Sequence, residues 1–169
     1  MRKPIDWFIG DTHFGHANLL TFENNTRPYT NIDEHDEALV SNWNSVVGSD
    51  DRVFHLGDVA FASKYHYLKH LAGRKIIVVL GNHDYYSKID AIMEDKRYSV
   101  CGSFIYRREF LLTHIPVHTS QMDSRFKYNI HGHLHTHSLD DKRYINVSCE
   151  QVNMTPVSFG QIKERMTTL

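Results

Sequence analysis

Three apolar runs in the first half of the chain end in the same way, in a glycine that is followed by polar residues. They are IDWFIG (5–10), DRVFHLGD (51–58) and RKIIVVLG (74–81). Short runs rich in β-branched and aromatic residues are typical of buried strands, and the third is typical of a strand buried on both faces. Because helical patterns separate these runs, the first half of the chain predicts alternating strands and helices.

The remaining segments complete the predicted architecture. Helices are predicted over 31–47, which opens with a capping-box pattern, and over 63–73, 87–95 and 157–166. Short strands are predicted within 98–102, 104–114, 127–133 and 143–149. We therefore expect one domain, residues 1–169, with an α/β fold. Its architecture would be a four-layer α-β-β-α sandwich of two mixed sheets with flanking helices.

The overall charge argues against some classes of partner. Nineteen basic and twenty acidic side chains give a net charge of −1, which offers no general attraction for long nucleic acid or for an anionic membrane. The two cysteines, Cys101 and Cys149, form no metal-binding pair, and no apolar run approaches the roughly 18 residues of a membrane span. We expect a cytoplasmic protein with reduced thiols and no membrane partner. The oligomeric state is left open.

Polar blocks follow the predicted strands at their carboxyl ends. GDTH follows the first strand, GD closes the second and GNHD follows the third, while TH (113–114) and HGHLH (131–135) lie in the second half. In open α/β sheets, ligands bind at this edge. The side chains of these blocks that suit a metal ion are Asp11, His13, Asp58, Asn82, His114, His133 and His135.

The ligand chemistry predicts a pair of divalent ions. Asp11 and His13 are two residues apart, so an extended backbone places both side chains on one face. Asp58 has two carboxylate oxygens and can contact two cations. A mixture of nitrogen and oxygen ligands suits borderline ions, of which we expect Mn, with Fe, Ni or Zn as alternatives. The lack of thiolates in the set argues against a structural zinc site.

The blocks DTH, GD, GNHD, TH and GHLH resemble the calcineurin-like metallophosphoesterase superfamily, where they occur in this order. The resemblance extends from residue 11 to residue 135. WFIGDTHFGHAN, with RPY, NWNSVV and HLGDV after it, is similar to a small bacterial and phage phosphoesterase subgroup. In one departure, the fourth block has Thr113 before His114, where many relatives have glycine.

The resemblance implies a role for each residue. Asp11, His13 and His135 would bind the first metal ion, Asn82, His114 and His133 would bind the second, and Asp58 would bridge both. His83 would be the general acid, and Asp84 would orient its ring. Water shared by two such ions ionises near neutral pH and attacks the phosphoryl group.

The expected substrate is a small, nucleotide-like phosphodiester, with a phosphomonoester as a further option. Two alternatives remain open at this point. One is a nuclease that acts on short or single-stranded nucleic acid, and the other is a non-catalytic protein-binding scaffold with the same fold. The intact GNHD block and paired histidines favour an enzyme.

Other polar residues near the motifs are candidates for substrate contacts. His16 and Asn18 would contact substrate phosphate or support His13, and Tyr85 would stack a base. Arg27 would be either a forked phosphate clamp or a tie for its own loop. Six of the remaining histidines form three pairs: His66 and His70 on a helix surface, His35 and His118 in solvent, and His55 and His131 in the core or behind the ligands.

Overall fold

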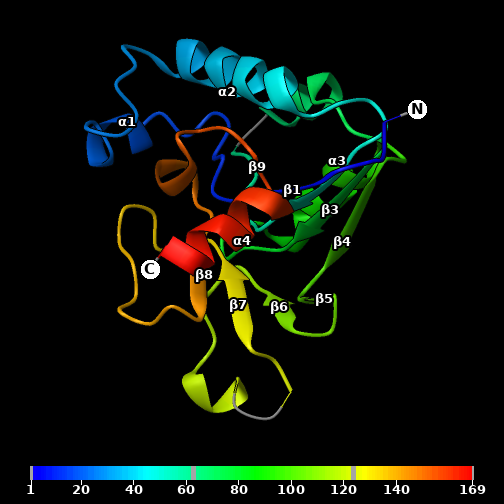
Figure 1. Cartoon of the computed structure of the whole chain (residues 1–169). Coiled ribbons are helices and arrows are strands. Elements are labelled where there is room, and N and C mark those ends of the chain that lie inside the picture. The colour runs from blue at the N-terminus through cyan, green and yellow to red at the C-terminus, as the bar shows by residue number, and fades with distance from the viewer. Residues whose placement is uncertain (1, 62–63, 123–124, 169) are drawn as a thin grey trace.

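The computed structural model of the protein describes residues 2–61, 64–122 and 125–168 (Figure 1). The first sheet has five strands in the order β4-β3-β2-β1-β9. β1 to β4 are parallel, and β9 is antiparallel to β1, so this sheet is mixed as predicted. Its strands are β1 (Asp6–Ile9), β2 (Arg52–His55), β3 (Lys75–Val79), β4 (Tyr98–Cys101) and β9 (Val157–Ser158).

The second sheet has four strands in the order β5-β6-β7-β8. β5 and β6 are antiparallel, whereas β6, β7 and β8 are parallel, so this sheet is mixed too. The strands are β5 (Phe104–Tyr106), β6 (Phe110–Leu112), β7 (Tyr128–His131) and β8 (Tyr144–Asn146).

Aromatic side chains join the two sheets into one core. The ring of Phe8 on β1 stacks on that of Phe54 on β2, and both rings lie edge-on to Tyr106 of β5, at 5.4 and 5.3 Å. Phe159 lies 5.0 Å from the Tyr106 ring, at the start of the last helix. Burial of such rings supplies most of the favourable free energy of folding.

Helices flank the sheets, as predicted (Figure 1). α2 begins with the expected cap, because the Asn31 side chain accepts a hydrogen bond from the Glu34 amide. Its Trp43 ring lies over His55 of β2, so α2 covers the five-stranded sheet. No helix of the described residues is long and apolar enough to cross a membrane. The α-helices are α1 (Leu19–Phe22), α2 (Ile32–Val46), α3 (Tyr86–Met93) and α4 (Phe159–Thr168).

Three segments differ from the prediction. In place of the α-helix over 63–73, the described part forms a 3₁₀ helix, η1 (Lys64–His70). Its two buried side chains are three residues apart, which matches three residues per turn. The single run 104–114 is a hairpin, β5 to β6. The predicted last helix begins with a short strand, β9, which pairs with β1. Two further 3₁₀ helices are η2 (Thr119–Gln121) and η3 (Cys149–Val152).

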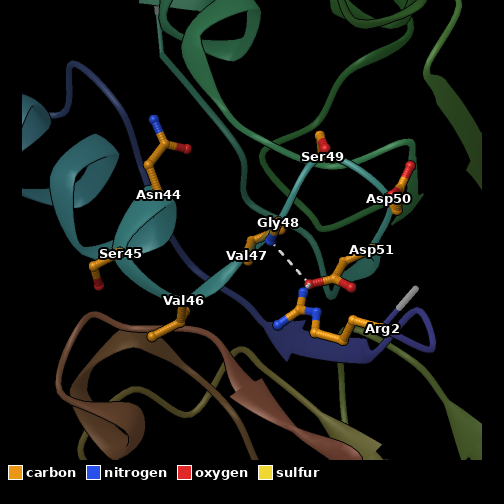
Figure 2. A pocket seen from close by; sticks show the side chains of 9 residues that line it. All are labelled: Arg2, Asn44, Ser45, Val46, Val47, Gly48, Ser49, Asp50 and Asp51. Atoms are coloured by element: carbon orange, nitrogen blue, oxygen red, sulfur yellow. Dashed lines mark hydrogen bonds and ion pairs between the residues drawn. The ribbon is translucent and has the colours of Figure 1, made fainter.

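Asp51 precedes β2 and forms hydrogen bonds at the amino-terminal end of this strand, away from the polar blocks (Figure 2). Its buried carboxylate accepts hydrogen bonds from the backbone amides of Ile5 (2.8 Å) and Gly48 (2.9 Å) and from the Trp7 indole (2.9 Å). It also pairs with Arg2. One side chain therefore holds the segment before β1, the end of α2 and the start of β2 together.

We expect Asp51→Asn to lower the free energy of unfolding by about 1–3 kcal/mol near neutral pH, since buried amides lose an acceptor. Burial raises the pKa of Asp51, but hydrogen bonds from Ile5, Gly48 and Trp7 outweigh it and hold the pKa below its usual value. A carboxyl group whose pKa is lower in the folded protein stabilises the fold at pH values above its pKa in the unfolded chain, about 3.9. This stabilisation is lost as the pH falls through the pKa of the folded protein.

Urea unfolding at several pH values measures this effect. The gap between Asp51→Asn and the native protein should be widest near neutral pH and narrow below about pH 4. Asp50→Asn is the matched control, because Asp50 is exposed. A gap that stays constant with pH, or an equal effect of Asp50→Asn, would contradict the assignment.

Candidate metal centre

The two sheets bring their polar blocks to one place. Asp11 and His13 follow β1, Asp58 follows β2 and Asn82 follows β3. His114 follows β6 of the second sheet, and His133 and His135 follow β7. The carboxyl ends of parallel strands share one edge of a sheet, and the packed sheets place both such edges together.

The first candidate metal site consists of Asp11, His13 and His135, whose ligand atoms lie within 4.8 Å of one another. Asp11 Oδ1 is 3.9 Å from His13 Nε2 and 4.0 Å from His135 Nε2. The two imidazole rings are stacked, with centroids 5.2 Å apart. These three residues are the set that the resemblance assigns to the first ion.

The second candidate site consists of Asp58, His114 and His133, again within 4.8 Å. Asn82 Oδ1 lies 2.9 Å from His114 Nε2, so the amide oxygen faces the same group. His114 Nδ1 donates to the carbonyl of Leu56 at 2.7 Å, which leaves Nε2 as the atom available to a metal ion.

Asp58 lies between the two sites. Its Oδ2 atom is 3.6 Å from His13 Nε2 of the first site and 3.4 Å from His114 Nε2 of the second. Its Oδ1 atom accepts the backbone amide of His83 at 2.9 Å. One carboxylate oxygen thus faces both groups of ligands, the position that a bridging ligand needs.

The buried atoms of the centre fit divalent ions. His13 is buried, and neither of its ring nitrogens has a hydrogen-bond partner among the described residues. Burial holds the pKa of His13 well below its usual value, so the ring is neutral, the form that binds a metal. Burial also raises the pKa of Asp11 to about 6, although the charges of His114 and His135 act in the opposite direction, and a bound divalent ion would favour the ionised form.

Hydrogen bonding and charge couple Asp58 to His114. Burial raises the pKa of Asp58, but the hydrogen bond and charge of His114 outweigh it and hold this pKa below its usual value. Burial lowers the pKa of His114, but Asp58 and Asp11 outweigh this effect and raise it to about 9. Negative charge from two buried aspartates thus draws a proton onto His114, and a metal ion would satisfy the same charge.

The backbone at the ligands is strained. Five ligand residues have positive φ angles between 49° and 69°, a backbone conformation that residues other than glycine rarely adopt. Such conformations cost on the order of 1–3 kcal/mol each and concentrate at functional sites. The residues are Asp11, His13, Asp58, His133 and His135.

Glycines allow the ligand loops to approach one another. A Cβ atom at Gly132 would lie 2.5 Å from Asp11 Oδ2, and one at Gly81 would overlap the carboxylate of Asp58. Both glycines are therefore required by the space that the two aspartates occupy.

His83 and Asp84 stand beside the ligands. The His83 ring lies 5.8 Å from the His13 ring and 5.2 Å from Phe61. Buried Asp84 accepts the backbone amides of Asp58 (2.7 Å), Val59 (3.0 Å) and Gly81 (2.8 Å). These bonds hold the loops of Asp58 and Asn82 together. The expected orientation of the His83 ring by Asp84 stays a prediction.

The residues expected to contact substrate lie in different places. His16 is half-buried beside His13, and its ring stacks on Phe61 at 4.2 Å. Asn18 is exposed at the start of α1, and Tyr85 is 58% exposed directly after Asp84. Substrate contacts by His16, Asn18 and Tyr85 stay predictions.

Arg27 does not face the substrate side. It is fully buried, and it donates to Glu150, to the carbonyls of Asp11 and Thr12, and to His35. These partners contact all three guanidinium nitrogens, and the side chain has no exposed surface, so it cannot reach a phosphate in solution. The prediction of a phosphate clamp is wrong, and the alternative, a tie for the loop, describes the residue.

The other histidines were mostly placed correctly. His66, His70 and His118 are exposed, whereas His55 and His131 are buried. His35 was expected in solvent, and this is wrong, because it is buried between Arg27 and Asp36. Glu150, which contacts His135, was missed because it belongs to none of the motif blocks.

Comparisons with known proteins agree with this geometry. The chain matches the model of the calcineurin-like phosphoesterase superfamily domain over residues 8–166. It is 35% identical to an uncharacterized protein of Methanocaldococcus jannaschii, over 96% of this chain and 90% of that protein. It is 31% identical to the gene 66 protein of Mycobacterium phage L5, over 77% of each chain.

A solved structure of a protein of unknown function from Aquifex aeolicus has a similar fold. The TM-score is 0.75 at 23% identity, and the match covers 96% of this chain and 99% of the other. This structural similarity shows the fold alone, whereas the match to the family model and the two relatives shows the family. The chain belongs to the calcineurin-like phosphoesterase superfamily.

Proposed function

We propose that the protein is a metal-dependent phosphodiesterase that hydrolyses a small, nucleotide-like substrate at a two-metal centre. The observation that carries the proposal is the place of Asp58 Oδ2, within 3.6 Å of a ligand nitrogen of each site. A carboxylate so placed is suited to join two ions rather than to complete one site.

The residues of this chain divide the task of holding two ions. Asp11, His13 and His135 would hold the first, Asn82, His114 and His133 would hold the second, and Asp58 would contact both. Two bound divalent ions, Mn²⁺ in our proposal, would polarise the phosphoryl oxygens and lower the pKa of water. Five of the ligands have strained positive φ angles, which persist only because the surrounding structure holds the backbone in that conformation.

His83 is the proposed proton donor to the leaving oxygen. It belongs to neither group of candidate ligands among the described residues. Its amide is nevertheless fixed to Asp58 Oδ1, which holds the residue beside the centre. A positioned acid of this kind contributes about 10²–10⁴-fold to the rate.

Aromatic side chains near His83 favour a nucleotide-like substrate. Phe61 lies 5.2 Å from the His83 ring, and Tyr85 is an exposed aromatic residue two positions further on. Aromatic faces stack on bases without demanding one sequence. The net charge of −1 supports a small substrate over long nucleic acid, and we propose no membrane partner.

The proposal is tested on purified protein with Mn, Ni, Zn and Mg each added to the metal-free form. Substrates would be cyclic nucleotides, dinucleotides, nucleotide sugars, short oligonucleotides and a nitrophenyl phosphodiester. We expect two transition-metal ions per chain by elemental analysis, hydrolysis of at least one small diester, and no activity after chelation. One ion in the active protein, or undiminished turnover in excess EDTA, would overturn the two-metal proposal.

A further inference from the structure

A buried carboxylate lies directly behind the first metal site. Glu150 follows β8 within η3, and its side chain has no exposed surface. Its Oε1 atom is 3.0 Å from His135 Nδ1 and 2.7 Å from Arg27 Nε. One oxygen of Glu150 therefore contacts a candidate metal ligand and a permanent cation.

These contacts fix the tautomer of His135. An ionised carboxylate only accepts hydrogen bonds, and the guanidinium of Arg27 keeps Glu150 ionised. His135 Nδ1 must therefore carry the proton. In the neutral ring, the Nε2 atom, which faces Asp11 Oδ1 at 4.0 Å, then keeps its lone pair and is the atom available to a metal ion. Carboxylates behind metal-binding histidines orient the ring and raise its basicity.

Arg27 connects Glu150 to the rest of the first site. Its guanidinium donates to the carbonyls of Asp11 at 2.6 Å and Thr12 at 3.2 Å, which belong to the loop that carries His13. The Arg27–Glu150 pair thus holds both ligand loops of the first site.

Hydrogen bonds also connect Arg27 to two residues of α2. Arg27 lies 3.0 Å from His35 Nε2, and His35 Nδ1 lies 2.9 Å from Asp36 Oδ1. Asp36 accepts the backbone amide of Gly15 at 3.0 Å, two residues beyond His13. Removing Arg27 would leave several buried polar groups unpaired, so Arg27 variants would mainly report on folding.

The second site has a different support. His114 Nδ1 donates to the backbone carbonyl of Leu56. Asp84 holds the amides of Asp58, Val59 and Gly81. Neither His114 nor Asp84 is bonded to Glu150 in these contacts. The two sites therefore differ in the carboxylate behind their histidines.

We propose that Glu150, held by Arg27, is a positioning residue that sets the metal affinity of the first site and not of the second. The inference rests on the proposed two-metal centre. It adds a residue outside the motif blocks, together with a way in which the two sites would differ. Substitution of such a partner usually costs about 10–100-fold in metal affinity.

The test is calorimetric titration of metal-free protein with Mn²⁺. His135→Ala and His133→Ala identify the binding steps of the first and second sites, because His135 is a ligand of the first proposed site and not the second, and His133 is a ligand of the second and not the first. We expect Glu150→Gln to weaken the first step by about 10–100-fold. The second step should change by less than about threefold, because the contacts of Glu150 are with Arg27 and His135 and not with the second group of ligands.

Glu23→Gln is the matched control. The Glu23 carboxylate lies within 4.8 Å of ligand atoms of Glu150 and His135, so the substitution removes the same charge from the same region. The His135 ring donates no hydrogen bond to Glu23 in the described structure; its Nδ1 atom is paired with Glu150. We expect Glu23→Gln to leave both steps nearly unchanged. Equal weakening by Glu23→Gln and Glu150→Gln would overturn the proposal, because it would mean that only nearby charge matters.

A spectroscopic measurement separates positioning from general damage. In metal-free protein, at a pH high enough for the His135 ring to be neutral, its nitrogen shifts should show a proton on Nδ1 and none on Nε2, and Glu150→Ala should give a mixture of tautomers. An unchanged tautomer, or equal losses at both steps in Glu150→Gln, would overturn the proposal. Native protein that binds one ion, through a site that Glu150→Gln weakens, would overturn the two-metal proposal yet still support Glu150.

Discussion

Asp58→Asn is expected to lose more than about 10³-fold in kcat/KM, beyond the usual loss for one preorganised electrostatic group. Asp58 Oδ2 faces His13 of one site and His114 of the other, so the substitution weakens two sites together. Asparagine keeps the size of the side chain but offers one neutral oxygen in place of two charged ones. It cannot serve both metal ions and the His83 amide equally well.

The control for this experiment is a ligand of one site only. His133→Ala removes a side chain from the second group and leaves the first group intact. We expect this variant to bind one ion tightly and to lose less activity than Asp58→Asn. Elemental analysis, circular dichroism and kcat/KM would be measured for both proteins. A nearly active Asp58→Asn enzyme, or one that still binds two ions tightly, would contradict the bridging assignment.

The location of the centre was predictable because it depends on short-range patterns. Asp11, Asp58 and Asn82 each follow an apolar strand, and parallel strands end at one edge of a sheet. That rule brings distant residues to one place without knowledge of any tertiary contact, as His13 and Asp58 show, which are 45 positions apart in the sequence. The alternation of His133 and His135 around one turn was readable in the same way.

The supports of the centre were not predictable, since they depend on distant partners. Arg27 and Glu150 are separated by 123 positions and meet only because the loop after α1 packs against η3. Nothing local distinguishes a buried arginine from an exposed one, so the sequence could not decide between a phosphate clamp and a loop tie for Arg27. His35 was misjudged for the same reason, because its partner is that same arginine. A buried ion pair is a property of the packed fold.

Small elements were missed because their stability comes from packing. β9 has only two residues, and its pairing with β1 stabilises it more than its own sequence does. η1 has the composition of a helix, but the burial of Tyr65 and Leu68 at a spacing of three residues favours the 3₁₀ form.

His83→Ala is expected to have effects that depend on the leaving group. Nitrophenolate departs readily as an anion, whereas an alkyl or ribose alkoxide requires a proton. His83 lies beside the ligands and belongs to neither group among the described residues, so the variant should keep its metal content. We expect substantial activity on a nitrophenyl diester and a loss of about 10²–10⁴-fold on an alkyl or nucleoside diester.

The comparison variant is His135→Ala, which removes a ligand of the first site and should fail on both substrates with loss of metal. The measurement is kcat/KM on the two substrate types for native protein and both variants, with metal content determined for each. The ratio of the two losses is the decisive quantity, since a folding defect or a loss of metal lowers both activities together. Equal losses on the two leaving groups in His83→Ala would mean that His83 positions the phosphate and does not protonate the leaving oxygen.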